Sequence, residues 1–214
     1  MRARLSIALP AAALATISGC VSLKRTPEAR FFALQPVAEA PAPASAAPAE
    51  AGVVGVLPVL LPGHLERPQL VRWSGPGEVR IDEFLRWAEP LDTGVLRVLT
   101  EDLETLLPAY RVIRAPWPGS TPLRCRVRVE LVRFGPQPGG ELSLSGRFAL
   151  LPARSERPLV TRALELRHDA PRGNDPGLTV DGMSALLAQM GAQIATAVAA
   201  LPPDPPEPAL KEPR

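Results

Sequence analysis

The sequence predicts an α/β protein of the α+β type, a two-layer sandwich in which two helices cover one face of a mainly antiparallel sheet. One stretch near the middle of the chain alternates apolar and charged residues, as expected for a strand with one face in water. Two other stretches repeat apolar residues at helical spacing. The strands between these helices follow one another along the chain, which favours an antiparallel meander.

Residues 1–19 are predicted to be a lipoprotein signal peptide. Met1–Arg4 carries two arginines, and Leu5–Ile17 is apolar and uncharged. That run is too short for a bilayer core, which needs about 20 apolar residues, but it is typical of a signal peptide. The small residues Ser18–Gly19 before Cys20 resemble the lipobox of bacterial lipoproteins, in which the cysteine receives the lipid. An ordinary signal peptide that merely ends near Cys20 is the alternative.

The covalent lipid on Cys20 is the only cofactor expected, and it would attach the domain to a membrane, because two or three acyl chains hold a protein stably. Val21 and Ser22 follow, and neither is the aspartate that retains a lipoprotein in the inner membrane in the enterobacterial pattern. We therefore expect the periplasmic face of the outer membrane, with that of the inner membrane as the alternative. Cys125 then remains alone, and its alternation with apolar residues predicts a small buried hydrophobe.

Residues 20–51 are predicted to form the lipidated N-terminus and a tether rich in alanine and proline. Within them, Phe31–Leu34 is a short apolar island, expected either as an edge strand docked on the domain or as a segment lying against lipid. Pro36–Glu50 consists mostly of Pro, Ala, Ser and Glu, which offer nothing to bury. The folded domain is predicted over residues 52–201, and the proline-rich residues 202–214 are predicted to be a disordered tail.

Strands and helices are expected in a simple order within the domain. The first helix is expected to have Asp92 or Thr93 as its cap and to stop at Pro108, and the second runs from Asp181 to Leu201. The expected strands are Gly52–Leu61, Glu78–Ile81, Tyr110–Ile113, Leu123–Phe134, Glu141–Leu151 and Pro158–Asp169.

Two short motifs lie between the first expected strand and the first helix. One is Leu65-Glu66-Arg67-Pro68-Gln69-Leu70, and the other is Arg86-Trp87-Ala88-Glu89-Pro90-Leu91. In this order behind a lipobox, they resemble the PqiC family of ABC-transport auxiliary lipoproteins, from about Phe31 to Leu201. The chain departs from the family pattern at His64 and Glu66, where the family tends to have a tyrosine and an aspartate.

The resemblance implies a non-enzymatic lipoprotein subunit of an intermembrane lipid-transport system, anchored at the outer membrane. It implies a membrane-protein partner with MCE domains that spans the periplasm, and a ring-forming homo-oligomer that docks the partner's far end. The alternative is a monomeric periplasmic lipid carrier whose sheet and helices enclose a small apolar cavity. The net charge of +2 argues against a nucleic-acid binder.

The two motifs are predicted to form the interface, because arginine and tryptophan carry binding energy well. Alternatively, Arg67 pairs internally with Glu66 or with a helix carboxylate, and Trp87 belongs to the core. The predicted interface residues are Leu65, Glu66, Arg67, Pro68, Gln69, Leu70, Arg72, Arg86, Trp87, Glu89 and Pro90.

No catalytic or metal-binding residue is predicted. His64 and His168 lie apart in the chain and lack ligand spacing with any cysteine or carboxylate pair. The sequence shows no nucleophile elbow, phosphate-binding glycine loop or zinc-protease motif. The stripe Arg124, Arg126 and Arg128 is expected to be a solvated strand face, with lipid phosphates or an acidic partner as the alternative ligands. The carboxylates expected to be solvated or to cap a helix are Asp82, Glu83, Glu89 and Asp92.

Overall fold

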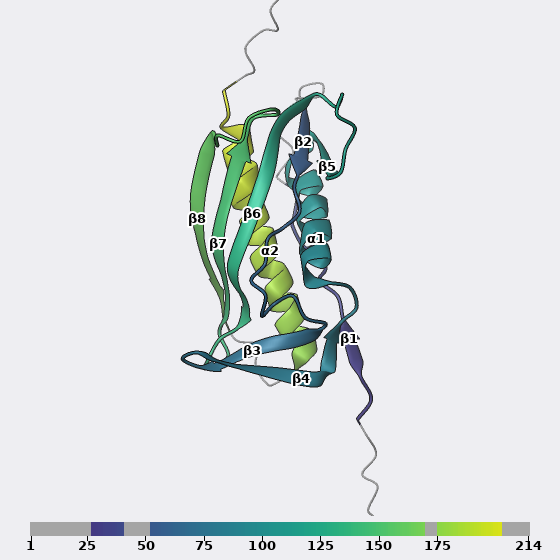
Figure 1. Ribbon diagram of the computed structural model, residues 1–214, viewed down its shortest axis with the longest axis vertical. Coiled ribbons are helices and arrows are strands. Elements are labelled where there is room, and N and C mark those ends of the chain that lie inside the picture. The colour runs from purple at the N-terminus through teal and green to yellow at the C-terminus, as the bar shows by residue number, and fades with distance from the viewer. Residues whose placement is uncertain (1–26, 41–51, 170–174, 203–214) are drawn as a thin grey trace, which may run out of the picture.

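The computed structural model describes residues 27–40, 52–169 and 175–202. These residues form two helices and two β-sheets (Figure 1), so the predicted α+β class is confirmed. Cys20, the predicted signal peptide 1–19, most of the Ala/Pro stretch and nearly all of the predicted tail lie outside the described residues.

The larger sheet has five strands in the order β5-β2-β6-β7-β8. The predicted meander is confirmed, because β6, β7 and β8 pair antiparallel. The short strand β2 instead pairs parallel with both β5 and β6, so the sheet is mixed. Parallel pairing follows from the long connection that carries the chain from β2 through a helix to β5. The strands are β2 (Val53–Val56), β5 (Arg111–Arg114), β6 (Leu123–Pro136), β7 (Leu142–Leu151) and β8 (Val160–His168).

A second sheet of three strands, in the order β1-β4-β3, closes one end of the molecule (Figure 1). Its strands are β1 (Arg30–Phe32), β3 (Gln69–Gly75) and β4 (Glu78–Trp87). The docked edge strand predicted at the apolar island is confirmed, because β1 pairs parallel with the end of β4. The sequence missed β3 and most of β4, because this hairpin is half exposed on both faces and lacks a clear apolar alternation.

Two helices, α1 (Leu91–Leu106) and α2 (Pro176–Ala199), cover one face of the larger sheet. The predicted cap of α1 is wrong, because Pro90 occupies the N-cap and neither Asp92 nor Thr93 caps the helix. The predicted start of α2 at Asp181 is also wrong. Asp175 caps this helix, and its Oδ1 accepts the N–H of Gly177 at 3.0 Å. Proline suits the first helical position, although Pro–Gly in a sequence suggests a loop.

The core lies between the helices and the inner face of the larger sheet. Leu99, Met190 and Phe148 are fully buried there, and Cys125 is 0% exposed, as predicted for a small buried hydrophobe. By length and composition α2 could cross a membrane, but 61% of its most apolar stretch is buried inside the domain. Helix α2 is therefore the core helix of this fold, packed on β6, β7 and β8.

Gly146 of β7 lies where β6 bulges between Leu131 and Arg133. A Cβ at Gly146 would lie 2.2 Å from the carbonyl oxygen of Glu130 and 2.9 Å from the Cα of Leu131. We expect Gly146→Ala to lower the free energy of unfolding by about 1–3 kcal/mol, because the clash is with backbone that cannot turn aside. Urea unfolding would measure this, with Gly63→Ala as the control because no atom lies within 4 Å of that Cβ. Equal losses in the two variants would contradict the expectation.

Candidate interaction surface and N-terminal strap

The tertiary structure brings the two predicted interface motifs together. The N–H of Trp87 donates to the carbonyl of Pro68 at 2.7 Å, and Gln69 lies opposite Arg86 in the β3–β4 ladder. The first motif is the entry to β3 and the second is the exit of β4. One continuous surface at the end of the molecule therefore contains both.

The side chains of the first motif divide into buried and exposed groups. Leu65 is only 4% exposed, and its N–H donates to the carbonyl of Pro62 at 2.8 Å. Glu66, Arg67 and Pro68 are exposed, and we name these three residues the docking turn. In the described part of the chain, neither Glu66 nor Arg67 forms an ion pair, so the internal pairing considered for Arg67 is not observed.

The polar residues beside the docking turn are engaged with Glu83 of β4. The Nε2 of Gln69 donates to Glu83 Oε2 at 3.0 Å, and the Nε of Arg86 donates to the carbonyl of Glu83 at 3.0 Å. Trp87 is 7% exposed and belongs to the core, which was the alternative to its interface role. Gln69, Arg86 and Trp87 therefore hold the hairpin in place around the docking turn.

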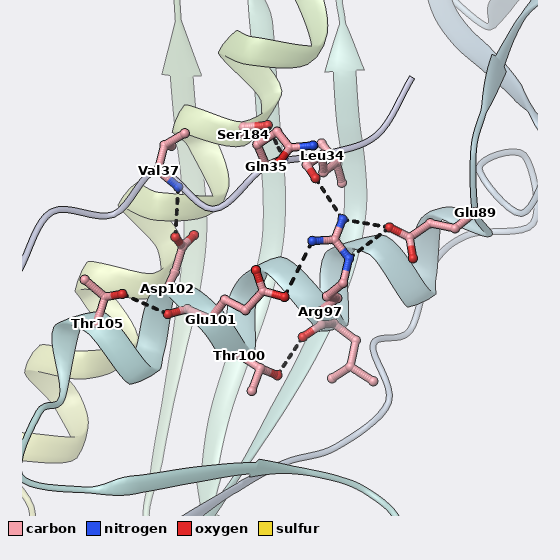
Figure 2. Close-up of polar contacts among 11 residues, drawn as sticks. Leu34, Gln35, Val37, Glu89, Arg97, Thr100, Glu101, Asp102, Thr105 and Ser184 are labelled. Atoms are coloured by element: carbon pink, nitrogen blue, oxygen red, sulfur yellow. Dashed lines mark hydrogen bonds and ion pairs between the residues drawn. The ribbon is translucent and has the colours of Figure 1, made fainter. Parts of the chain in front are cut away.

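Glu89, one of the predicted interface residues, binds the guanidinium of Arg97 on α1 (Figure 2). Its Oε1 accepts hydrogen bonds from Nε at 3.1 Å and from Nη2 at 2.8 Å. The same Nη2 donates to the carbonyl of Leu34 at 2.8 Å, and Nη1 lies 3.6 Å from Glu101 Oε1. The hydrogen bond to Glu89 raises the pKa of Arg97, against the opposing effect of its partial burial. Sequence reasoning did not identify Arg97 as a linking residue, because in the sequence it looks the same as a solvated arginine on the polar face of a helix.

Residues 30–38, which we name the N-terminal strap, cross both helices after β1 (Figure 2). Leu34 is 1% exposed. The N–H of Gln35 donates to Ser184 Oγ on α2 at 3.1 Å. The N–H groups of Val37 and Ala38 donate to Asp102 Oδ1 on α1 at 3.1 and 3.0 Å. This part of the predicted tether is therefore packed on the domain, beyond the apolar island that the sequence expected to dock.

Asp102 is the buried acceptor that holds the far end of the strap. The side chain is 0% exposed, and burial raises its pKa, while the N–H groups of Ala38 and Val37 oppose that rise. Its Oδ2 has no hydrogen-bond partner among the residues that the structure describes. A buried carboxyl group with one unpaired oxygen is unusual, because buried carboxyl groups normally have hydrogen-bond partners for both oxygens.

A cleft of about 710 Å³ lies between the β3–β4 hairpin, the start of α2 and the end of β6. Its walls are mainly apolar, and charged groups from β1, β3 and β4 also line it. The apolar walls include Leu70, Val71, Ile81, Trp87, Phe134 and Met183. The charged groups are Arg30, Arg72, Arg80, Asp82 and Glu83.

The arginine stripe on the outer face of β6 is partly neutralised within the chain. Glu156 forms ion pairs with Arg126, at 2.9 Å, and with Arg128. Hydrogen bonds from Arg128 and Arg126 lower the pKa of Glu156. The solvated-face interpretation is thus favoured over a site for lipid phosphates.

Neither histidine belongs to a group of side chains that could hold a metal ion in the described ranges. The ring of His64 packs edge-on against Trp73 with centroids 5.4 Å apart, and His168 Nδ1 lies 2.9 Å from the carbonyl of Asp169. Among residues 27–40, 52–169 and 175–202, no three His, Cys, Asp or Glu side chains are grouped to hold a metal ion. What the described residues offer to other molecules is an exposed turn and a cleft.

Comparison with known families decides which kind of protein has this arrangement. The model of the family described as ABC-type transport auxiliary lipoprotein component matches residues 32–195. The chain belongs to this family. Its membership makes it a membrane-associated, periplasmic lipoprotein and an auxiliary component of a transport system. No curated protein sequence matches the chain.

Solved structures share the fold of this family member. An uncharacterised protein of known crystal structure is 20% identical with a TM-score of 0.60, over 81% of this chain and 97% of its own. A protein of the DUF330 family from Xanthomonas campestris is 16% identical with a TM-score of 0.61, over 78% of this chain and 93% of its own. At such identities the likeness shows the fold alone.

The buried Asp102 leads to a pH-dependent prediction. Because burial raises its pKa above the ordinary value of about 3.9, the folded chain binds the proton more tightly than the unfolded chain does. The carboxyl therefore stabilises the fold below its unfolded pKa, and this contribution is lost as pH rises through the folded pKa. We expect the free energy of unfolding of the native chain, relative to Asp102→Asn, to decrease from about pH 3.5 to neutrality. Urea unfolding at a series of pH values checks this, and parallel curves would contradict it.

Proposed function

We propose that this lipoprotein is the outer-membrane subunit of an MCE-type intermembrane lipid-transport system, that Cys20 carries its lipid anchor, and that it docks the far end of the periplasm-spanning MCE partner. The single observation that carries the docking role is the exposed docking turn, Glu66–Pro68. Buried Leu65 holds the turn on one side, and the bond from the N–H of Trp87 to Pro68 holds it on the other.

A turn held in this way presents Arg67 at low entropic cost. Proline fixes the backbone next to it, and the described residues provide no internal carboxylate partner that a ligand would have to displace. A guanidinium can form two parallel hydrogen bonds with one carboxylate, which adds geometric specificity to the contact. We therefore expect the partner to present an acidic side chain or a terminal carboxylate to Arg67.

The proposal includes a homo-oligomeric ring that surrounds the docked partner. The predicted interface residues would have two different roles in this ring. The exposed members Glu66, Arg67, Pro68 and Pro90 are available for contact with the partner or with a neighbouring subunit. Leu65 and Trp87 support the surface from within the core.

A single substitution in the docking turn tests this function. We expect Arg67→Ala to weaken capture of the MCE partner by about tenfold or more, because truncation of a central interface arginine commonly costs about 2 kcal/mol. Affinity of the full-length lipoprotein in detergent for the partner would be measured by surface plasmon resonance, and oligomer mass by mass photometry.

Arg154→Ala is the matched control, because Arg154 is equally an exposed arginine without an ion pair in the described residues, in the connection after β7. If Arg67→Ala and removal of the Leu65–Arg72 segment both leave oligomer mass and partner capture unchanged, the docking role is wrong.

The cleft of about 710 Å³ favours a second candidate function, that of a monomeric lipid carrier. Its volume lies in the range of small-molecule sites, and its apolar walls suit part of an acyl chain. A carrier should co-purify with phospholipid in a ratio of about one to one, which lipid extraction and native mass spectrometry would measure. Absence of bound lipid would contradict the carrier, and a discrete oligomer that captures the partner would support the docking subunit.

A further inference from the structure

We propose that the N-terminal strap turns the end of the domain formed by the three-stranded sheet toward the bilayer, and that the Ala/Pro stretch does not set the distance between domain and membrane. The proposal concerns a lipid surface as the partner of one end of this fold. It rests on the proposed lipid anchor at Cys20.

The order of segments along the chain carries the first step. The strap, residues 30–38, precedes residues 41–51, which hold most of the Ala/Pro stretch. Ala40 and Gly52, which flank that stretch, both belong to the described part of the structure. Because the two ends of the stretch are fixed on the same folded body, its length adds nothing to the distance between Cys20 and the domain.

The second step is the reach of the chain before the strap. A fully extended chain spans about 3.3–3.6 Å per residue, so Pro27 lies at most about 25 Å from Cys20. Had the whole of residues 20–51 been a tether, the domain could have stood about 110 Å away. The difference is large enough to decide which part of the domain can approach the membrane.

The third step is the attachment of the strap itself. Pairing of β1 with β4 holds its start, and the N–H of Ala88 adds a bond to the carbonyl of Phe32 at 2.8 Å. Nη2 of Arg30 lies 3.8 Å from Oδ1 of Asp175, the N-cap residue of α2. Buried Leu34 and the polar bonds to Arg97, Ser184 and Asp102 hold the rest (Figure 2). Contacts with β4 and with both helices make this segment part of the domain.

The fourth step is direction. The described chain begins at the end of the molecule that carries β1, β3 and β4, and α2 ends at the opposite end (Figure 1). Phe32 lies opposite Trp87, and Gln69 lies opposite Arg86, so the docking turn is close to the entry point of the anchor. The cleft lies at this end too. The anchor therefore places the docking turn and the cleft at the bilayer surface.

The surface at this end is suited to contact with lipid. Phe31 of β1 is 63% exposed and Leu178 in the first turns of α2 is 44% exposed. An exposed phenylalanine beside Arg30 is an arrangement that fits the boundary between headgroups and acyl chains. A docked partner would thus release or receive its cargo within the reach of one short segment from the membrane.

Two insertions of equal length test the proposal. A flexible Gly/Ser segment of about twenty residues would be inserted after Leu23 in one variant and after Ser45 in the other. The lipidated full-length chain would be reconstituted in vesicles of phosphatidylethanolamine and phosphatidylglycerol that carry an acceptor dye. A donor dye would be placed by Pro76→Cys at the β3–β4 turn or by Arg154→Cys in the β7–β8 connection.

We expect stronger energy transfer from the Pro76→Cys label than from the Arg154→Cys label. The insertion before the strap should lengthen the mean separation from the membrane by about 14 Å, as expected for a flexible chain. The insertion after the strap should leave it unchanged. Equal effects of the two insertions, or stronger energy transfer from the Arg154→Cys label than from the Pro76→Cys label, would overturn the proposal.

Failure of the anchor would be visible separately. Cys20→Ala should abolish recovery of the chain with vesicles. If this variant is recovered with vesicles as well as the wild-type chain is, both the proposed lipid anchor and the orientation derived from it are wrong. If Cys20→Ala abolishes recovery but the two insertions have equal effects, the orientation set by the strap is wrong and the proposed function stands.

Discussion

The guanidinium of Arg97 joins three parts of the chain that are far apart in sequence. It binds Glu89 at the exit of β4, the carbonyl of Leu34 in the N-terminal strap and Glu101 one turn along α1. Without it, a buried carbonyl and a half-buried carboxylate would lose their partner, which is more costly than the loss of an exposed ion pair. This one side chain therefore links the exit of β4 and the strap to α1.

The smaller sheet in turn decides what the molecule can present to others. Its β4 strand pairs with β1 on one side and β3 on the other, so the start of the strap and the docking turn share one support. The cleft forms where this sheet meets α2 and β6. Under the proposed function, contacts with lipid and with a protein partner would form at this same end of the molecule.

Relatives share this fold at 20% identity and below. Such divergence is tolerated where aliphatic residues of similar volume replace one another in a core. The turn between Leu65 and Gln69 is of a different kind, because it combines one buried leucine with exposed charged residues held by backbone bonds.

The sequence alone determined the meander, the existence of both helices and the buried Cys125, because strict alternation and helical spacing depend on local chemistry. It also identified the two motifs, but not that Pro68 and Trp87 meet. The tertiary structure decided the β3–β4 hairpin, the role of Glu89 and the path of the strap across Asp102. These features rest on hydrogen bonds between distant residues, which leave no periodicity in the sequence from which they could be predicted.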